Sequence, residues 1–290
     1  MAQAPIFDLQ SHSEHSDGAL APAQVVELAA AAGVELLALT DHDTVDGVGE
    51  ALQAGRRAGI RVVPAVELSA VDGAQEDLHV LGYGVDHEDP TLRELLRDYR
   101  EDRQRRIDAM AARLVELGFE LDRDELERRR REGQPVGRPH LAHALMGHPA
   151  NHARLRAEGT DAVSELFARY LVPGAAAYVP RQRPSVYEAI EAIHAAGGQA
   201  VWAHPFWDIP EAEVVLAMIG RFSDADLDGV EAFYPTHSAE QVESLCDACD
   251  QAGLLTTGSS DFHGPRHATF SRFRDFELYG HAPRLGPIAI

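Results

Sequence analysis

The chain has 290 residues and a mass of 31.6 kDa, which is long enough for one large domain or for a domain that carries an insertion. Its formal net charge of −21 disfavours binding to long nucleic acid, because an acidic protein repels polyanions. All 26 basic residues are arginine, so a Schiff-base lysine and the phosphate-binding lysine of a P-loop are both excluded.

The N-terminus has neither the basic flank nor the apolar segment of a secretory signal, and no run of eighteen apolar residues indicates a membrane span. We therefore expect a cytoplasmic protein with no membrane partner. Cys246 and Cys249 form a lone Cys-x-x-Cys inside a predicted helix, which favours ordinary packing over redox chemistry or a zinc site.

Short apolar runs alternate with helical segments from the N-terminus to about residue 85. The pattern predicts strands at 5–9, 34–40, 60–68 and 78–85, with helices at 22–32 and 44–58. The run VELLALT is continuously apolar, as expected for a parallel strand that is buried on both faces. This order predicts a parallel sheet, either open or closed into a barrel.

From 87 to 171 the chain is mainly helical and rich in charge, with a long amphipathic helix at 92–117. Alternation then resumes, with helices predicted at 185–196, 211–221 and 239–252 and strands at 199–203, 229–233 and 254–257. We therefore predict an α/β fold: a β/α barrel formed by residues 1–86 and 172–290, interrupted once by a small helical domain at 87–171.

Histidines and carboxylates follow most of the predicted strands. The active site of a β/α barrel lies at the carboxyl ends of its strands, so we expect these side chains to gather there. Imidazole and carboxylate together suit zinc, iron or manganese, and their number exceeds the needs of one tetrahedral site. The sequence therefore predicts two or three divalent metal ions, held by residues drawn from His12, Asp17, His42, Glu67, His79, His204, Asp261 and His263.

Four motifs occur in a specific order: DLQSHSEHSDG, LTDHD, AHP and SDFH. This pattern resembles the PHP (polymerase and histidinol phosphatase) family of metallophosphoesterases, over Asp8 to about Gly84 and Pro180 to Pro265. The resemblance implies a distorted β/α barrel of the PHP type. The helical insertion resembles the subgroup that removes phosphate from nucleotides, including nucleoside 3′,5′-bisphosphates, and would cap the substrate. Some relatives of that subgroup trim short RNA from the 5′ end.

The resemblance also implies three metal sites. The first would use Gln10, His12, Glu67 and Asp261; the second, Glu67, His79 and His204; the third, Asp17, His42 and His263. Gln10 departs from the family pattern, which begins His-x-His. A glutamine carbonyl is neutral and a poorer donor than imidazole toward zinc or iron. We therefore expect the first site to be weak, selective for manganese or magnesium, or empty, with manganese favoured overall over zinc, iron and magnesium.

Arg138 and His140 in the insertion match the Arg-x-His of the nucleotide subgroup, and we predict that they bind substrate phosphate. Arginine suits phosphate because its planar fork donates two parallel hydrogen bonds. His237 follows a predicted strand and is a candidate for a catalytic role, as the general acid for the leaving oxygen. It could instead hold the phosphate or serve as a hydrogen-bonding residue of the loop.

These features predict a metal-dependent phosphoesterase that hydrolyses a phosphomonoester of a small nucleotide, such as a nucleoside 3′,5′-bisphosphate, by metal-activated hydroxide. The predicted partner is a small phosphorylated substrate. One alternative is a 5′-3′ exoribonuclease acting on short oligoribonucleotides. Another is a metal- or nucleotide-binding module that has lost turnover through the change at Gln10. An amidohydrolase is disfavoured, because the chain has neither a lysine to carboxylate nor a His-x-His pair in its first motif.

Overall fold

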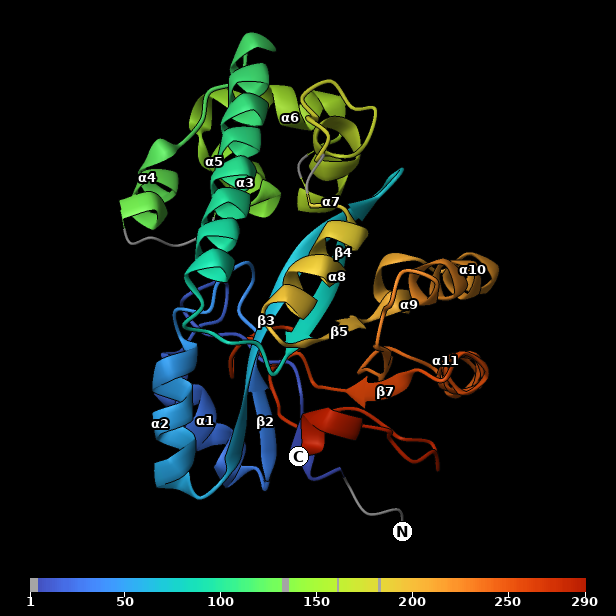
Figure 1. Ribbon diagram of the computed structural model, residues 1–290. Helices are drawn as coiled ribbons and strands as arrows, with labels where there is room; N and C mark the ends of the chain where they lie inside the picture. The colour runs from blue at the N-terminus through green and yellow to red at the C-terminus, as the bar shows by residue number, and fades with distance from the viewer. Residues whose placement is uncertain (1–4, 132–135, 161, 182–183) are drawn as a thin grey trace. The chain divides into compact units, whose positions relative to one another are not determined.

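The computed structural model describes residues 5–131, 136–160, 162–181 and 184–290, and the chain divides into two compact units (Figure 1). One unit is Met1–Arg97 with Pro184–Ile290, and the other is Asp98–Arg183. The sequence predicts the inserted helical domain at residues 87–171, whereas the second compact unit of the structure is 98–183. Helix α3 (Pro90–Glu116) runs through the N-terminal boundary of this unit.

Within the described residues, the first unit contains one sheet whose seven strands neighbour one another in chain order. They are β1 (Phe7–Asp8), β2 (Leu36–Leu39), β3 (Arg61–Asp72), β4 (Gln75–Tyr83), β5 (Gln199–Trp202), β6 (Gly229–Phe233) and β7 (Leu255–Gly258). The ends of the sheet also meet: Leu9 N–H donates to Gly258 O at 3.2 Å, and His12 N–H donates to Phe262 O at 2.8 Å. These bonds bring the sheet round into a barrel, which confirms the predicted fold class.

The prediction of an all-parallel sheet is wrong for β4. This strand pairs antiparallel with both β3 and β5, whereas the other neighbours pair parallel. A parallel connection needs a crossover of about a dozen residues, and only residues 73 and 74 separate β3 from β4. A hairpin is therefore the one connection available, and Gly73 supplies the left-handed backbone (φ +61°) that its tight turn needs.

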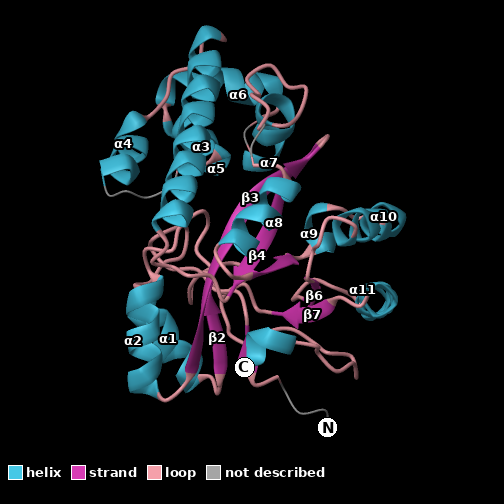
Figure 2. Ribbon diagram, in the orientation of Figure 1, coloured by secondary structure: helices cyan, strands magenta, loops and turns pink. Residues whose placement is uncertain are grey.

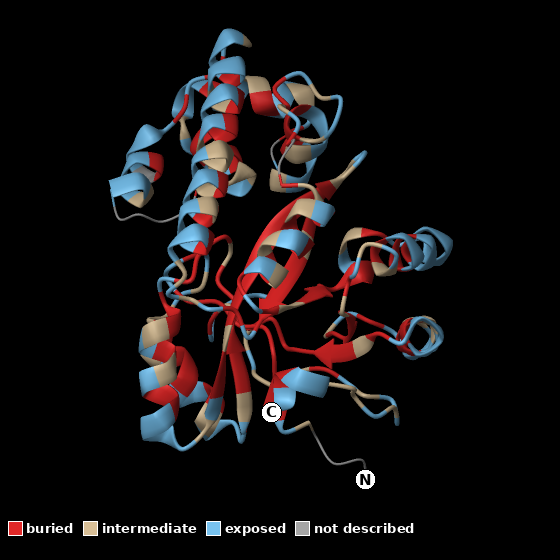
Figure 3. Ribbon diagram, viewed as in Figure 1, coloured by how far each residue is buried: buried red, intermediate tan, exposed pale blue. Residues whose placement is uncertain are grey.

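Helices cover the outside of the barrel, and the strands are buried (Figures 2 and 3). The helices are α1 (Pro22–Ala31), α2 (Val48–Ala58), α8 (Val186–Ala195), the single turn α9 (Pro205–Asp208), α10 (Ala212–Ser223) and α11 (Ala239–Ala252), with a 3₁₀ turn at Gly286–Ala289. Val25 and Ala29 of α1 pack with Leu37 and Leu39 of β2. Each helix thus buries one apolar stripe against the sheet, which is why their periodicity was readable in the sequence.

Local signals also fix where the helices begin and end. Ser185 Oγ accepts from Glu188 N–H at 3.2 Å, and Glu188 Oε2 accepts in return from Ser185 N–H at 2.8 Å. This reciprocal pair caps the start of α8. Gly253 directly follows the last residue of α11, and its left-handed backbone (φ +71°) allows the chain to leave the helix. The predicted bounds of α11 and of β6 are confirmed to the residue.

The second unit is helical and has its own apolar core. Beyond α3 it contains α4 (Arg123–Arg131), α5 (Arg138–Gly147), a 3₁₀ turn (Pro149–Asn151), α6 (His152–Glu158), α7 (Val163–Leu166) and a π-helical turn (Phe167–Leu171). Its core includes Met110, Leu114, Phe119, Leu141 and Leu145. A separate core is the mark of an independent domain. Among the helices that the structure describes, none is long and apolar enough to cross a bilayer.

The loop after β1 turns sharply back on itself before α1. Gly18 N–H donates to Ser13 O at 3.0 Å, and Ser16 N–H donates to the same oxygen at 3.1 Å. A Cβ at Gly18 would lie 2.2 Å from His12 O and 2.8 Å from Ser13 N, well inside van der Waals contact with the backbone. The tight path of this loop therefore depends on glycine at position 18.

We predict that Gly18→Ala lowers the free energy of unfolding by about 1–3 kcal/mol, because the backbone of the loop must shift to accept the methyl group. Thermal or urea unfolding measures the change. Gly49→Ala is the matched control: its Cβ would meet nothing within 4 Å, and it lies inside α2. That substitution should stabilise the protein by about 0.5–1 kcal/mol. Equal stability of the two variants would contradict the argument.

Candidate metal centre

Glu67 of β3 lies fully buried in the middle of the predicted ligand cluster. Its two oxygens face different histidines: Oε2 lies 3.1 Å from His12 Nε2, and Oε1 lies 3.1 Å from His79 Nδ1 and 3.4 Å from His204 Nε2. Donor atoms of Glu67, His79 and His42 all lie within 4.8 Å of one another. The carboxylate therefore stands between imidazoles from several strands, as a ligand shared by two ions would.

A second group of donor atoms gathers around Asp17, in the loop after β1. Asp17 Oδ2 lies 3.5 Å from His42 Nε2, and Asp17 Oδ1 lies 3.4 Å from His263 Nε2. His12 Nδ1 is 3.6 Å from the same Oδ1. One donor atom from each of these four residues lies within 4.8 Å of the others, a spacing that one cation can span. His42 belongs to this group and to the group around Glu67.

Asp261 and Gln10 complete the cluster. Asp261 Oδ1 lies 3.0 Å from His12 Nε2, and its other oxygen accepts a 2.8 Å hydrogen bond from the Tyr234 hydroxyl. Gln10 is buried, and its side-chain N–H donates to Glu67 Oε2 at 2.9 Å. The fold thus brings every residue predicted as a metal ligand into one cluster. Gln10 presents its amide nitrogen, not its oxygen, to Glu67.

Several buried nitrogen and oxygen atoms of this cluster lie close together without forming hydrogen bonds. Among the residues that the structure describes, His12 Nε2, His42 Nδ1 and Asp261 Oδ1 have no hydrogen-bond partner, although the first and last are 3.0 Å apart. An unsatisfied buried polar atom costs about 1–3 kcal/mol. A divalent cation would satisfy these lone pairs, and the mixture of imidazole and carboxylate suits manganese, iron or zinc. The residues present therefore fit a metal centre.

Burial and neighbouring charges set the charge states in the cluster. Burial favours a neutral Glu67, yet the surrounding histidines hold the pKa of Glu67 well below its usual range, and the same balance lowers the pKa of Asp17. Burial lowers the pKa of His42 to about 4, so its imidazole is neutral at pH 7. Burial opposes charge on His12 and His204 too, yet the adjacent carboxylates raise the pKa of both rings well above its usual range. Ionised carboxylates and neutral imidazoles are the forms that bind metal ions, so metal binding would release protons from His12 and His204.

Buried carboxylates outside the ligand set hold the ligand-bearing loops in place. Asp8 of β1 accepts from Ser260 N–H at 2.9 Å and from Ser260 Oγ–H at 2.6 Å, next to Asp261. Asp41, after β2, accepts from the N–H and Oγ–H of Ser13 at 2.7 and 2.6 Å. Ser13 directly follows the candidate ligand His12 in the chain. Each aspartate therefore ties a ligand loop to a neighbouring strand through two short hydrogen bonds.

Asp43 and Glu231 make similar ties on the other strands. Asp43 accepts from Ser69 N–H at 3.0 Å, and Glu231 accepts from His204 N–H at 3.0 Å. Glu231 Oε1 also lies 2.6 Å from Ser259 Oγ. Burial raises the pKa of Glu231 to about 8, whereas the hydrogen bond that it accepts from the Ser259 hydroxyl favours the ionised carboxylate. The sequence did not single out Glu231. The signal that could have identified it is a glutamate inside GVEAF (β6), a strand that is buried on both faces.

The backbone is strained where the ligand loops leave the strands. His204, Asp261 and Asp43 have φ values of +28°, +52° and +53°, a region that non-glycine residues seldom occupy. Such conformations persist only where the surroundings enforce them, and they cluster at functional sites. Here the hydrogen bonds that the buried carboxylates accept from the loops supply that enforcement.

Arg138 and His140 lie on α5 of the helical unit. Arg138 Nη1 donates to Leu171 O at 3.4 Å, and its guanidinium carbon lies 5.8 Å from the centre of the Phe167 ring. His140 Nδ1 accepts from Gly137 N–H at 3.0 Å. These contacts all lie within the helical unit, and the phosphate-binding role of the two residues stays a prediction.

His237 is buried in the loop after β6. Its Nδ1–H donates to Ala232 O at 2.9 Å, and its ring lies 5.4 Å from that of Tyr234 and 5.7 Å from that of Phe206, centre to centre. Burial lowers the pKa of His237 to about 4, so the ring is neutral and Nε2 is an acceptor. To donate a proton from Nε2 the ring would first have to be protonated. The catalytic role of His237 stays a prediction.

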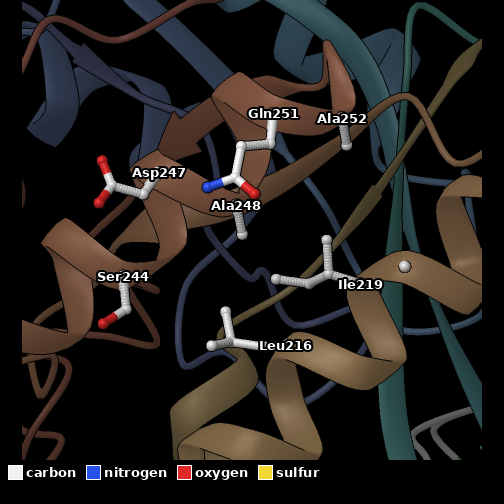
Figure 4. A pocket seen from close by; sticks show the side chains of 8 residues that line it. Leu216, Ile219, Ser244, Asp247, Ala248, Gln251 and Ala252 are labelled. Atoms are coloured by element: carbon white, nitrogen blue, oxygen red, sulfur yellow. The ribbon is translucent and has the colours of Figure 1, made fainter.

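A small cavity of about 140 Å³ opens onto the cluster. Its lining combines the ligands with three aromatic residues: Gln10, His42, Glu67, His79, His204, Trp207, Tyr234, Asp261, His263 and Phe270. A larger hollow of about 510 Å³ lies between α10 and α11 (Figure 4). Small and aliphatic side chains such as Leu216, Ile219 and Ala248 line that hollow, together with Asp247. Of these two hollows, the smaller one combines space with candidate metal ligands.

Comparison with known proteins agrees with this geometry. The chain is 34% identical over 282 residues to a 3′,5′-nucleoside bisphosphate phosphatase of Chromobacterium violaceum, covering 97% of this chain and 93% of the relative. It is 31% identical over 264 residues to the 5′-3′ exoribonuclease Rnm of Escherichia coli, covering 90% and 86%.

Two solved structures are also similar. One, a Chromobacterium violaceum protein described as an amidohydrolase and solved with sulfate and no metal, has a TM-score of 0.76 and 33% identity over 98% of this chain and 93% of that one. The other, from Bifidobacterium adolescentis and described as a candidate metal-dependent phosphoesterase, has a TM-score of 0.72 and 30% identity over 92% and 91%. The PHP domain model matches residues 8–192, and the chain belongs to the PHP domain family.

Proposed function

We propose that the protein removes a phosphate from a small nucleotide, with a nucleoside 3′,5′-bisphosphate as the substrate class to test first. The protein is a metal-dependent phosphoric ester hydrolase. The observation that carries the proposal is the buried cluster around Glu67, in which unpaired histidine and carboxylate atoms converge on one small cavity. The identity with the Chromobacterium violaceum phosphatase over nearly the whole chain supports the choice of substrate.

Size also supports a small substrate group in the cavity. Pockets that enclose a drug-sized ligand occupy about 300–1,000 Å³, whereas the cavity over the cluster measures about 140 Å³. It therefore admits a phosphate group but not a whole nucleotide. The cleaved phosphate would enter the cavity, and the rest of the substrate would lie outside its mouth.

We propose that the cluster holds two divalent ions, most suitably manganese. His12, Asp17, His42 and His263 would hold one, and Glu67, His79 and His204 the other. When bound, such ions lower the pKa of water and neutralise charge on the phosphoryl oxygens. The residues of this chain position that chemistry: His42 and Glu67 link the two groups, with His42 Nδ1 3.6 Å from Glu67 Oε2, and Asp208 Oδ2 lies 3.3 Å from His204 Nδ1.

Further residues would act on the substrate itself. Arg138 and His140 are proposed to bind a phosphate of the nucleotide, because a guanidinium fork matches phosphate oxygens in shape and charge. A second candidate function, 5′-3′ hydrolysis of short oligoribonucleotides, is favoured by the identity with the Escherichia coli exoribonuclease over 90% of this chain. The loss-of-turnover alternative is decided by the same assay.

The first prediction is phosphate release from adenosine 3′,5′-bisphosphate by the manganese-loaded protein, measured beside AMP, a short 5′-phosphorylated oligoribonucleotide and histidinol phosphate. His42→Ala should reduce the rate by roughly 100-fold or more, because His42 belongs to both donor groups. His15→Ala changes an exposed histidine of the loop after β1; it is the control and should keep the native rate.

Release of nucleotides only from the oligoribonucleotide would identify the protein as an exonuclease. Silence on all four substrates, with metal bound, would leave a binding module.

The second prediction concerns Gln10. Its amide nitrogen donates to Glu67 Oε2, and its oxygen lies 3.3 Å from Ser259 Oγ, so both ends of the amide are already used. We expect elemental analysis to give about two ions per native chain and about three in Gln10→His, since imidazole is the better donor. Gln10→Ala, which removes the amide without adding a ligand, is the control. A native chain that already binds three ions would show that the amide turns its oxygen to a metal.

The third prediction separates a catalytic from a structural His237. His237→Asn keeps a donor near the position of Nδ1 for Ala232 O but removes Nε2. If His237 is the general acid, kcat for an alkyl phosphate should fall about 100-fold or more, with little change for p-nitrophenyl phosphate, whose leaving group needs no proton. Unchanged kcat on both substrates, with an unchanged unfolding midpoint, would assign His237 to the packing of the loop.

A further inference from the structure

We propose that Trp207, supported by the buried Phe270 and flanked by His267, forms a stacking surface for the base of a nucleotide whose phosphate occupies the metal centre. This inference rests on the proposed function and adds to it the part of the site that would select nucleotides over other phosphomonoesters. None of these three aromatic residues was among the residues singled out from the sequence.

Trp207 is an exposed aromatic residue that also lines the metal cavity. It lies in the short turn α9, three residues after His204, and half of its surface (50%) is exposed to solvent. Phe206, its neighbour, is buried, and Trp202, the other tryptophan of the chain, is completely buried. A ligand stacked on the exposed ring of Trp207 would give it the favourable burial that Trp202 already has.

The exposed ring is held in place by other aromatic residues. The centres of the Trp207 and Phe270 rings lie 5.3 Å apart with the planes at 65°, and Tyr234 lies 6.2 Å away at 64°. Tyr234 is itself fixed by its hydrogen bond to Asp261. These edge-to-face contacts hold the Trp207 ring in a defined orientation, as a preformed binding surface requires.

His267 extends this surface on the side of Phe270. Its ring is nearly parallel to that of Phe270, at 13° with 5.3 Å between the centres, and 5.2 Å separates it from the ring of His263. His267 is exposed. The aromatic group therefore continues from a predicted metal ligand outward to solvent.

The same group borders the metal cavity. Trp207, Tyr234 and Phe270 line it together with the candidate ligands, and its volume of about 140 Å³ excludes a whole nucleotide. A substrate with its phosphate at the ions must therefore place its remaining atoms at the mouth, where these rings lie. Every nucleobase has a π-face that stacks on aromatic side chains, whereas a sugar or an alkyl chain has none. The geometry thus favours a nucleotide over a sugar phosphate.

The test compares substrates with and without a base. For Trp207→Ala we expect the KM for adenosine 3′,5′-bisphosphate to rise by roughly tenfold, while the KM for ribose 5-phosphate stays the same. Trp207→Phe keeps a π-face and should lose much less. If Trp207→Ala raises both KM values equally, or neither, the stacking surface is refuted, although nucleotide hydrolysis by the native protein would still uphold the proposed function.

Fluorescence gives a readout that does not depend on turnover. Trp207 is the exposed member of the two tryptophans, so binding of a nonhydrolysable phosphonate analogue of the nucleotide should quench the emission of the metal-loaded protein. The quench should be absent in Trp207→Phe, and the base-free phosphonate should produce none. If no nucleotide is hydrolysed but the quench occurs, the stacking surface stands and the proposed phosphatase function falls. Equal signals with and without the base would overturn the inference.

Discussion

The structure of the barrel depends on the burial of Glu67 among histidines. A carboxylate taken out of water is costly unless opposite charges and hydrogen bonds surround it. Here the compensation comes from His12, His79 and His204, with Gln10 adding an amide donor. Because these residues lie in the loops after β1 and β5 and on β4, whereas Glu67 lies on β3, the cost of burying this carboxylate is met only when the barrel is closed.

Closure in turn relies on buried carboxylates that do not face the ions. Asp8 and Asp41 tie the loops after β7 and β1 to the neighbouring strands, and Glu231 joins the loops after β5 and β7. The donors are backbone N–H groups and serine hydroxyls, short groups that fix a loop tightly. This arrangement explains how His204 and Asp261 persist with left-handed backbones: each strained residue lies beside a hydrogen bond that removes its freedom to relax.

The division of the chain separates two sets of predicted site residues. The barrel unit carries the candidate metal ligands and the exposed Trp207, whereas Arg138 and His140 belong to the helical unit, which has its own core. The acidic balance of the whole chain, −21, suits the retention of divalent cations and a small substrate, because a few phosphates carry too little charge for repulsion to prevail. Specificity on this view comes from groups outside the cavity, since the cavity itself accepts only a phosphate.

The sequence by itself determined the fold class, most helices and strands, and the identity of the residues that cluster at the site. These features are encoded locally: apolar periodicity gave α11 and β6, and ligand-type residues after the strands marked the site. The antiparallel place of β4 follows from the two-residue connection after β3. Tertiary structure alone decided the direction of the Gln10 amide, the burial of Glu231 and the exposure of Trp207. Each depends on contacts between residues far apart in the chain, such as Gln10 with Ser259, because burial and hydrogen-bond direction exist only once the barrel has closed.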